Sequence, residues 1–391
     1  MGPRNAATQF LARNAEAPRF EVTLYGSLAA TGKGHMTDQA ILEVLGNERT
    51  TIIWEPKEFL PFHPNGMKFC ALDTAGKCTD KWTVYSVGGG ALAEEGQAPV
   101  EHKQVYEMNT ATDILSWCIS TGKSYWEYVE ECEGPEIWDY LREVWHTMKN
   151  AVQHGLEQEG VLPGPLALRR KAANYYVKAE GYQQSMRTRG FLFAYALAVS
   201  EENAAGGKIV TAPTCGSCGV LPAVLYHLYK SRDFSEQRII RALATAGLFG
   251  NIVKTNASIS GAEVGCQGEV GVACAMAAAA AAQLFGGMPS QIEYAAEMGL
   301  EHHLGLTCDP VCGLVQIPCI ERNAYAAARA MDANSYAMFT DGVHRVSFDK
   351  VVEVMKKTGH DLPSLYKETA EGGLAQDYKQ MWGNEHSSMY L

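Results

Sequence analysis

Long apolar runs and a surplus of positive charge are both missing from this sequence. Its most apolar stretch, Val270–Phe285, contains Gln283 and is shorter than the roughly 20 residues that a membrane-spanning helix needs. Met1–Phe20 is polar and carries no apolar core of a secretion signal. The 33 Lys and Arg against 44 Asp and Glu give a formal net charge of −11, so the chain has no basic footprint for nucleic acid or an anionic membrane. We expect a cytoplasmic protein that acts on a small molecule, with no nucleic acid and no membrane as partner.

The length of 391 residues exceeds what one compact core usually holds, so we expect two domains. In the first part of the chain, β-branched and aromatic residues concentrate in short segments, which is typical of strands. We predict strands at Glu21–Tyr25, Thr50–Trp54, Lys68–Leu72 and Trp82–Val87, and helices at Asn5–Arg13 and Thr37–Leu45. Gly88–Gly90 follows the last strand and marks a tight turn or a close approach of the backbone.

Helical periodicity dominates from Thr110 onward. Thr110 with Asp113 has the pattern of a helix start, and Ser290 with Glu293 predicts the start of a helix that reaches about Leu300. Further helices are predicted at Glu136–Gly155, Phe191–Val199, Leu221–Tyr229, Gln237–Phe249, Val270–Leu284, Asn323–Met338 and Phe348–Lys357. Several of them are apolar nearly all round, so we expect a central buried helix.

The segment Gly160–Leu166 is rich in Gly and Pro, which break helices and strands, and predicts a linker. No internal repeat of fixed period is found. The sequence therefore predicts an α+β fold in two parts. Residues 1–159 form a small mixed α/β domain with a helical connector, and residues 160–391 form a mostly helical domain.

The chain has eleven cysteines, which in a reducing compartment are free thiols, metal ligands or catalytic groups. Those beside Gly or Pro, where turns let thiolates converge, are Cys215, Cys218, Cys266, Cys308, Cys312 and Cys319. Thiolate suits zinc and iron–sulfur sites, and the spacing leaves two sets open. One is a tetrahedral zinc site made by Cys215, Cys218, Cys308 and Cys312. The other is a four-iron cluster with one open iron, held by Cys266, Cys308 and Cys319.

Two further segments bear on cofactors. Gly26–Gly34 is not a phosphate-binding P-loop, because its glycine spacing is wrong and Gly34 stands where Ser or Thr should follow Lys33. His35 comes directly after it and is a candidate proton shuttle, although a structural turn is the alternative. Ser185–Gly190 is similar to the loop around the Schiff-base lysine of pyridoxal-phosphate dehydratases. Arg187 occupies the lysine position and cannot lose a proton to form an imine, so no pyridoxal phosphate is expected.

Long motifs in both halves identify a family. The helical half carries Glu201–Gly207, Thr211–Thr214, Asn256–Gly271, Gly305–Val311 and Pro318–Asn323. The first half carries Gly26–Leu28, Thr31–His35, Phe62–Asn65 and Tyr85–Gly90. With these motifs the chain resembles, over nearly its whole length, the iron–sulfur L-serine dehydratases (L-serine ammonia-lyases) of the single-chain type, with fused β and α domains.

The resemblance implies a [4Fe-4S] cluster and a mechanism. The family's cluster ligands correspond to Cys266, Cys308 and Cys319, and the fourth iron acts as a Lewis acid on the carboxylate and β-hydroxyl of L-serine. His35 corresponds to the base that removes the α-proton, and water and then ammonia leave to give pyruvate. His63, Asn65 and Arg322 are weaker candidates for orienting the substrate.

The resemblance leaves two alternative functions open. A lyase of the same fold could act on L-threonine or L-cysteine, and a non-catalytic amino-acid-binding protein could hold structural zinc. A homodimer is the general expectation for a soluble chain.

The chain departs from the family at two places. Family members carry Ser-Ser-His-Thr just before the segment that matches Met1–Arg4, so we expect the chain to be truncated at its N-terminus, with the true start upstream. Some members end in a cysteine that caps the open iron, whereas this chain ends at Leu391 without one. The iron is then expected to rest with water or with a spare thiol such as Cys215 or Cys312. Cys215 itself stands where family members carry Asn.

Overall fold

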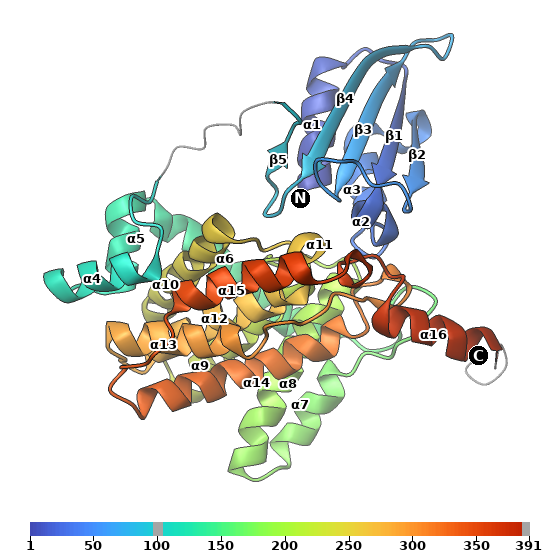
Figure 1. Cartoon of the computed structure of the whole chain (residues 1–391). Helices are drawn as coiled ribbons and strands as arrows, with labels where there is room; N and C mark the ends of the chain where they lie inside the picture. The colour runs from blue at the N-terminus through green and yellow to red at the C-terminus, as the bar shows by residue number, and fades with distance from the viewer. Residues whose placement is uncertain (97–104, 385–391) are drawn as a thin grey trace.

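The computed structural model describes residues 1–96 and 105–384. Figure 1 shows a sheet with helices near the N-terminus beside a larger group of helices, and each part has its own hydrophobic core. The smaller core lies between a sheet and two helices near the N-terminus. The larger core is formed by helices from residue 111 onward. The predicted α+β fold is therefore confirmed. Across the described ranges, no helix combines the length and the apolar character that crossing a bilayer requires.

A five-stranded mixed sheet forms the small domain. Its strands are β1 (Arg19–Tyr25), β2 (Thr50–Glu55), β3 (Gly66–Leu72), β4 (Cys78–Ser86) and β5 (Leu92–Ala93). They lie in the order β2-β1-β3-β4-β5, with β1 and β2 parallel and the other neighbours antiparallel. Alternate residues of β1 are fully buried against α1 (Gly2–Arg13) and α3 (Thr37–Leu45), as the two-residue period of a strand requires.

The predicted elements of this domain are all present, with two differences. β4 begins at Cys78 rather than Trp82, because the polar residues before Trp82 pair through their backbone with β3. The segment after β1 forms a short helix, α2 (Gly26–Ala30), which was not predicted from the sequence.

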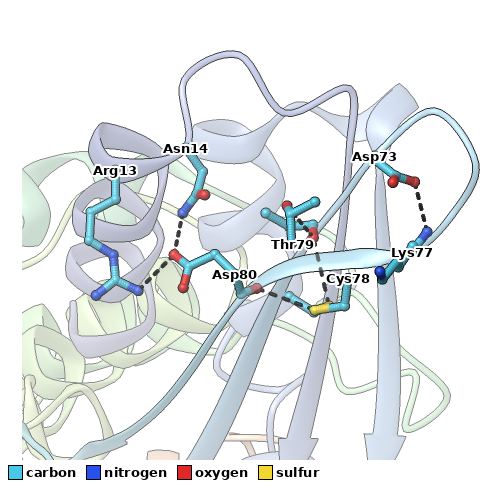
Figure 2. The surroundings of a disulfide bond; sticks show 9 residues. Arg13, Asn14, Asp73, Lys77, Cys78, Thr79 and Asp80 are labelled. Atoms are coloured by element: carbon cyan, nitrogen blue, oxygen red, sulfur yellow. Dashed lines mark hydrogen bonds and ion pairs between the residues drawn. A yellow bond between two sulfur atoms is a disulfide. The ribbon is translucent and has the colours of Figure 1, made fainter.

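Cys70 and Cys78 form a disulfide bond between β3 and β4, so the expectation that the cysteines are free thiols, metal ligands or catalytic groups is wrong for this pair. The tight turn between the strands brings the two together: the Asp73 carboxylate accepts hydrogen bonds from the backbone N–H groups of Ala75 and Lys77 at 2.9 and 2.8 Å. Figure 2 shows the surroundings, where Asp80 ties the strand to the end of α1. The nine other cysteines also lie in the described residues, and none of them forms a disulfide bond.

Among the described residues, thirteen helices follow the sheet domain, and all of them except the last build the large core. They are α4 (Ala111–Thr121), α5 (Tyr125–Glu133), α6 (Ile137–Glu157), α7 (Ala172–Glu180), α8 (Gln184–Ala204), α9 (Val220–Arg232), α10 (Glu236–Asn256), α11 (Gly261–Val264), α12 (Val270–Leu284), α13 (Pro289–Glu301), α14 (Cys319–Met338), α15 (Phe348–Asp361) and α16 (Gly373–Asn384). The expected central helix is α12, in which every side chain except Gln283 is buried and which packs on α9, α10, α13 and α14. Small side chains allow close packing: a Cβ on Gly299 of α13 would lie 2.9 Å from the Cα of Ala275.

Three predictions in this half need comment. α8 begins at Gln184 rather than Phe191, so Arg187 lies in a helix and not in a loop. Ser290 does not cap α13, because Met288 is its N-cap and Pro289, whose fixed φ suits the first turn, is its first residue. The helices predicted as a connector pack into the large core, where Trp145 is 1% exposed. The boundary between residues 159 and 160 stays a prediction.

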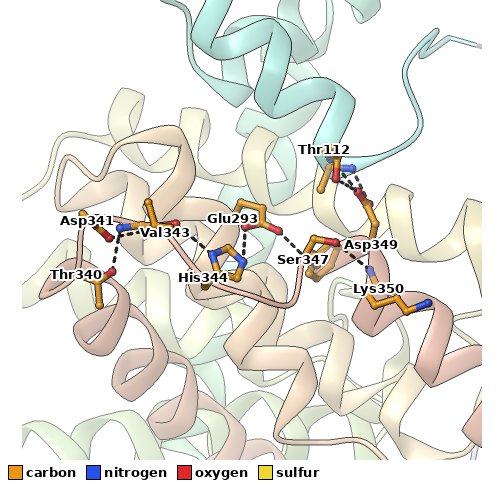
Figure 3. Close-up of polar contacts among 12 residues, drawn as sticks. Thr112, Glu293, Thr340, Asp341, Val343, His344, Ser347, Asp349 and Lys350 are labelled. Carbon is orange, nitrogen blue, oxygen red and sulfur yellow. Dashed lines mark hydrogen bonds and ion pairs between the residues drawn. The ribbon is translucent and has the colours of Figure 1, made fainter.

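Two carboxylates, the buried Glu293 and the partly buried Asp349, connect the starts of α4 and α15 with α13, and Figure 3 shows their contacts. Glu293 on α13 accepts a hydrogen bond from the backbone N–H of Phe348, the first residue of α15, at 2.6 Å, and pairs with His344 Nε2 at 2.9 Å. Asp349 accepts from the backbone N–H groups of Ala111 and Thr112 at 2.7 and 2.9 Å and so caps α4. The hydrogen bond to Glu293 raises the pKa of His344, against the opposing effect of burial.

We predict that His344→Gln destabilises the fold by about 1 kcal/mol in a pH-dependent way. Because the pKa of His344 is raised in the folded state, its contribution is complete below the unfolded pKa of about 6.5 and is lost as pH rises through the folded value. Urea unfolding of both proteins across this range should show the difference shrinking as pH rises. His302→Gln, which removes a more exposed ion pair with Glu301, serves as control. A difference for His344→Gln that grows with pH would contradict the pairing.

Candidate active site

A cavity of about 230 Å³ lies where the sheet domain meets the helical core. The sheet domain supplies polar and small residues, which include Thr31, His35, Asn65, Ser86 and Gly88–Gly90. The helical core supplies the opposite wall, which includes Thr211, Thr214, Cys215, Ser260, Gly261, Glu269 and Glu368. The cavity thus combines the Gly-rich turn after β4 with segments that are far apart in the sequence.

His35 lies at the centre of this cavity's polar contacts. Its Nδ1 is 3.1 Å from Cys215 Sγ, and its Nε2 is 2.9 Å from Glu368 Oε1. The turn that carries His35 packs closely on the helical core, since a Cβ on Gly34 would lie 2.2 Å from the carbonyl oxygen of Gly313. Gly34 therefore serves this contact and not a phosphate-binding loop.

The segment Tyr366–Glu368 carries Glu368 to His35. The backbone N–H of Cys308 donates to the carbonyl of Tyr366, and the N–H of Glu368 donates to the carbonyl of Cys308, both at 2.8 Å. The Ser27 hydroxyl donates to the carbonyl of Lys367 at 3.2 Å and so ties the same segment to α2. One short segment therefore links a candidate cluster cysteine, the cavity and the sheet domain.

His35 and Cys215 each shift the pKa of the other. Burial alone lowers the pKa of His35, but Cys215 and Glu368 outweigh it, and the pKa lies well above the ordinary value. Burial alone raises the pKa of Cys215, but His35 outweighs it, and the pKa is lowered. The contact is therefore suited to a thiolate beside an imidazolium.

The three predicted cluster cysteines gather behind the cavity wall. Cys266 follows α11, Cys308 lies in the loop after α13, and Cys319 is the first residue of α14. Cys266 and Cys308 are 3% and 6% exposed and hydrogen-bond to each other. Cys308 Sγ is 3.6 Å from Glu269 Oε1, and Glu269 lines the cavity. The charge of Cys266 also acts on Cys319, which places the third thiol nearby.

This donor set fits an iron–sulfur cluster better than zinc. Within the described part of the chain, no three His, Cys, Asp or Glu side chains converge as ligands of one metal ion. The zinc set of Cys215, Cys218, Cys308 and Cys312 is therefore not assembled, and Cys312 is exposed. In a cluster each thiolate binds its own iron, so the thiols need not converge on one point. Three free thiols, two of them buried and the third partly buried, lie at turns and a helix start and suit that arrangement.

The predicted substrate residues separate into two kinds. Asn65 lines the cavity. His63 does not: it accepts a hydrogen bond at Nδ1 from the backbone N–H of Asn65 at 3.1 Å, and its Nε2 pairs with Glu263 at 3.4 Å. Arg322 pairs with Asp309 at 3.2 Å beside the candidate cluster cysteines. These two residues support neighbouring segments.

Sequence reasoning did not single out Glu269, Glu368 and Thr214. Thr214 Oγ1 donates to Glu269 Oε2 at 2.5 Å on the cavity wall. A charged residue between Gly268 and the apolar α12 was a signal for Glu269. No local signal marks Glu368, whose place depends on long-range backbone pairing. The C-terminal tail expected to lack a capping cysteine includes residues 385–391, which lie outside the described residues.

Comparison with known proteins gives consistent matches. The family model of the serine dehydratase alpha chain matches residues 80–375, and that of the serine dehydratase beta chain matches residues 1–52 and 43–97. The L-serine dehydratase of Streptomyces coelicolor is 42% identical, over 96% of this chain and 94% of that protein. L-serine dehydratase 1 of Escherichia coli gives the same identity and coverage. The L-serine dehydratase of Helicobacter pylori is 36% identical, over 93% of this chain and 91% of that protein.

We predict that Glu368→Gln lowers the pKa of His35 by about one unit, because the substitution removes the anion beside Nε2. NMR titration of the histidine ring signals measures it, with a His35 variant to assign the resonance. Glu263→Gln, which removes the carboxylate beside His63, is the matched control and should leave His35 unchanged. An unchanged His35 pKa in Glu368→Gln would show that the ion pair is absent in solution.

Proposed function

The chain belongs to the serine dehydratase family, and we propose that it is an L-serine ammonia-lyase that forms pyruvate and ammonia with the help of a [4Fe-4S] cluster. The observation that supports this most is the position of the cavity. It has the His35 cluster of proton-carrying groups on one side and, behind Glu269 on the other, Cys308 with Cys266 and Cys319 nearby. The cytoplasm is the compartment we propose, because the site needs free thiols.

Cys266, Cys308 and Cys319 would hold the cluster, whose thiolate-free iron would supply Lewis-acid activation of the substrate carboxylate and hydroxyl. The chain's own residues supply the rest. Hydroxyl and amide groups of Asn65, Thr214 and Ser260 line the cavity and can hydrogen-bond a small amino acid. The reaction needs one group to take the α-proton and another to give a proton to the departing hydroxyl. The His35 site, with Cys215 and Glu368 around it, is the proton-transfer centre of the cavity.

After water leaves, the enamine becomes an imine, and hydrolysis of the imine in water gives pyruvate and ammonia. The chemistry does not by itself exclude L-threonine or L-cysteine, which offer a hydroxyl or a thiol at the same carbon. One added methyl group is discriminated only modestly by a pocket, so turnover of L-threonine is expected as a side activity.

We predict that the anaerobically reconstituted protein releases pyruvate from L-serine, and that kcat/KM for L-threonine is at least about tenfold lower. Coupled assay of the keto acid and of ammonia measures both products with L-serine, L-threonine and L-cysteine. Higher kcat/KM with L-cysteine or L-threonine would assign the chain to that rival substrate. Binding of L-serine without turnover would favour the non-catalytic reading.

For the cofactor, we predict about four irons and about four acid-labile sulfides per chain after reconstitution. Cys266→Ser, Cys308→Ser and Cys319→Ser should each lose iron, because each removes a thiolate ligand. Cys274→Ala, which removes an equally buried thiol from α12, is the matched control and should keep its iron. One zinc and no sulfide would refute the cluster. Exposure to air should deplete iron, since one iron has no thiolate.

A further inference from the structure

Both ring nitrogens of His35 are engaged. Nδ1 faces Cys215 Sγ at 3.1 Å and Nε2 faces Glu368 at 2.9 Å, and the imidazole is only 21% exposed. A general base needs a free lone pair within reach of the substrate proton. In this arrangement neither nitrogen offers one, and Cys215 lines the same cavity as His35. The geometry therefore favours the thiol of Cys215 over the imidazole of His35 as the general base.

Cys215 is held firmly in place. It begins a 3₁₀ turn, Cys215–Ser217, whose start is closed by contacts of Thr214 with the Ser217 hydroxyl, 3.1 Å from Thr214 Oγ1. Gly216 packs against Glu269, since a Cβ there would lie 2.7 Å from Oε2, and its carbonyl accepts from Asn323 Nδ2 at 2.7 Å. A turn fixed on both sides presents Cys215 Sγ to the cavity in one position, as catalytic groups require.

We propose that Cys215 and His35 act as a thiolate–imidazolium pair in which Cys215 Sγ removes the α-proton of the amino acid and His35 protonates its leaving hydroxyl. The inference deepens the proposed function and rests on it. It adds a second catalytic residue at a position where the resemblance gives Asn, and it supplies the acid as well as the base. Glu368 is a positioning residue, which holds His35 and stabilises its charge.

The step balances within the pair. The thiolate forms an S–H bond as the Cα–H bond breaks, and the released electron pair forms the C=C bond and expels the hydroxyl. A protonated Cys215 no longer accepts from His35 Nδ1–H, so that N–H is free to donate its proton to the departing oxygen. Water leaves, and the Cys215 proton then passes across the 3.1 Å contact to Nδ1, which restores the pair.

The groups that act on the Cys215 charge come from several elements. His35 contacts Cys215, Glu368 contacts His35, Glu269 packs on Gly216, and Cys319 lies within electrostatic range. Among these, only His35 touches Cys215 Sγ within hydrogen-bond distance in the described residues. Removing His35 should therefore change the reactivity of the Cys215 thiol more than any other single substitution.

Alkylation tests the pair without reference to turnover. Iodoacetamide reacts with the thiolate, and mass spectrometry of the holoenzyme gives the rate at Cys215 between about pH 6 and about pH 9. At about pH 6 we expect Cys215 to react about tenfold faster than in His35→Gln, and L-serine to protect it. Cys132→Ser, which removes a thiol outside the cavity, is the control and should leave the rate unchanged. Equal rates at Cys215 with and without His35 would overturn the pair.

Turnover tests the role. Cys215→Ser keeps the shape but not the thiolate, and we expect kcat for L-serine to fall about 100-fold or more, with KM and iron content retained. Exchange of the α-hydrogen of L-serine with deuterated water should fall by the same factor. A variant with full kcat would overturn the inference and leave the proposed function standing. No turnover of L-serine by the wild-type protein would refute the proposed function and this role with it, while alkylation still decides whether the pair exists.

Discussion

Backbone pairing between Cys308 and Tyr366–Glu368 is the constraint on which the site depends. The two 2.8 Å hydrogen bonds fix a candidate cluster cysteine to the segment that carries Glu368, and Glu368 holds His35 of the other domain. The pairing thus connects Cys308, a member of the large core, to the carboxylate that contacts the imidazole. A reaction that needs metal activation and proton transfer on one substrate requires both sides at a fixed distance.

The two cores contribute different parts of the site, and their composition explains the difference. The alanine-rich α12 lets its neighbours approach closely and makes a rigid block, at whose edges the turns with Cys266, Cys308 and Cys319 lie. The sheet domain contributes the turn with His35 and the glycines after β4, whose lack of side chains leaves room at the cavity. The site is thus built on rigid elements from two sides, and Cys215 stands at the contact between them.

Strong local sequence patterns were sufficient to predict much of this structure. The bounds of α3 and α12 were predicted correctly, because α3 has helical periodicity that ends at Gly46 and α12 is apolar along nearly its whole length. Cys266, Cys308 and Cys319 were placed at turns by the neighbouring glycines and prolines, and their proximity agrees with the family motifs. The helix start predicted at Ser290 was wrong, because Pro289 is already the first residue of α13. Glu368 could not be found, since its left-handed φ of 61° and its pairing with Cys308 depend on tertiary structure.

The central claim is that L-serine binds at the thiolate-free iron of a cluster that Cys266, Cys308 and Cys319 would hold. Mössbauer spectra of the reconstituted protein, recorded with and without L-serine, test it most directly. The account predicts that about one iron in four changes its signal when L-serine is added, because only that iron lacks a thiolate. Iron signals that are identical with saturating L-serine would contradict the account and would leave the cluster with a structural role alone.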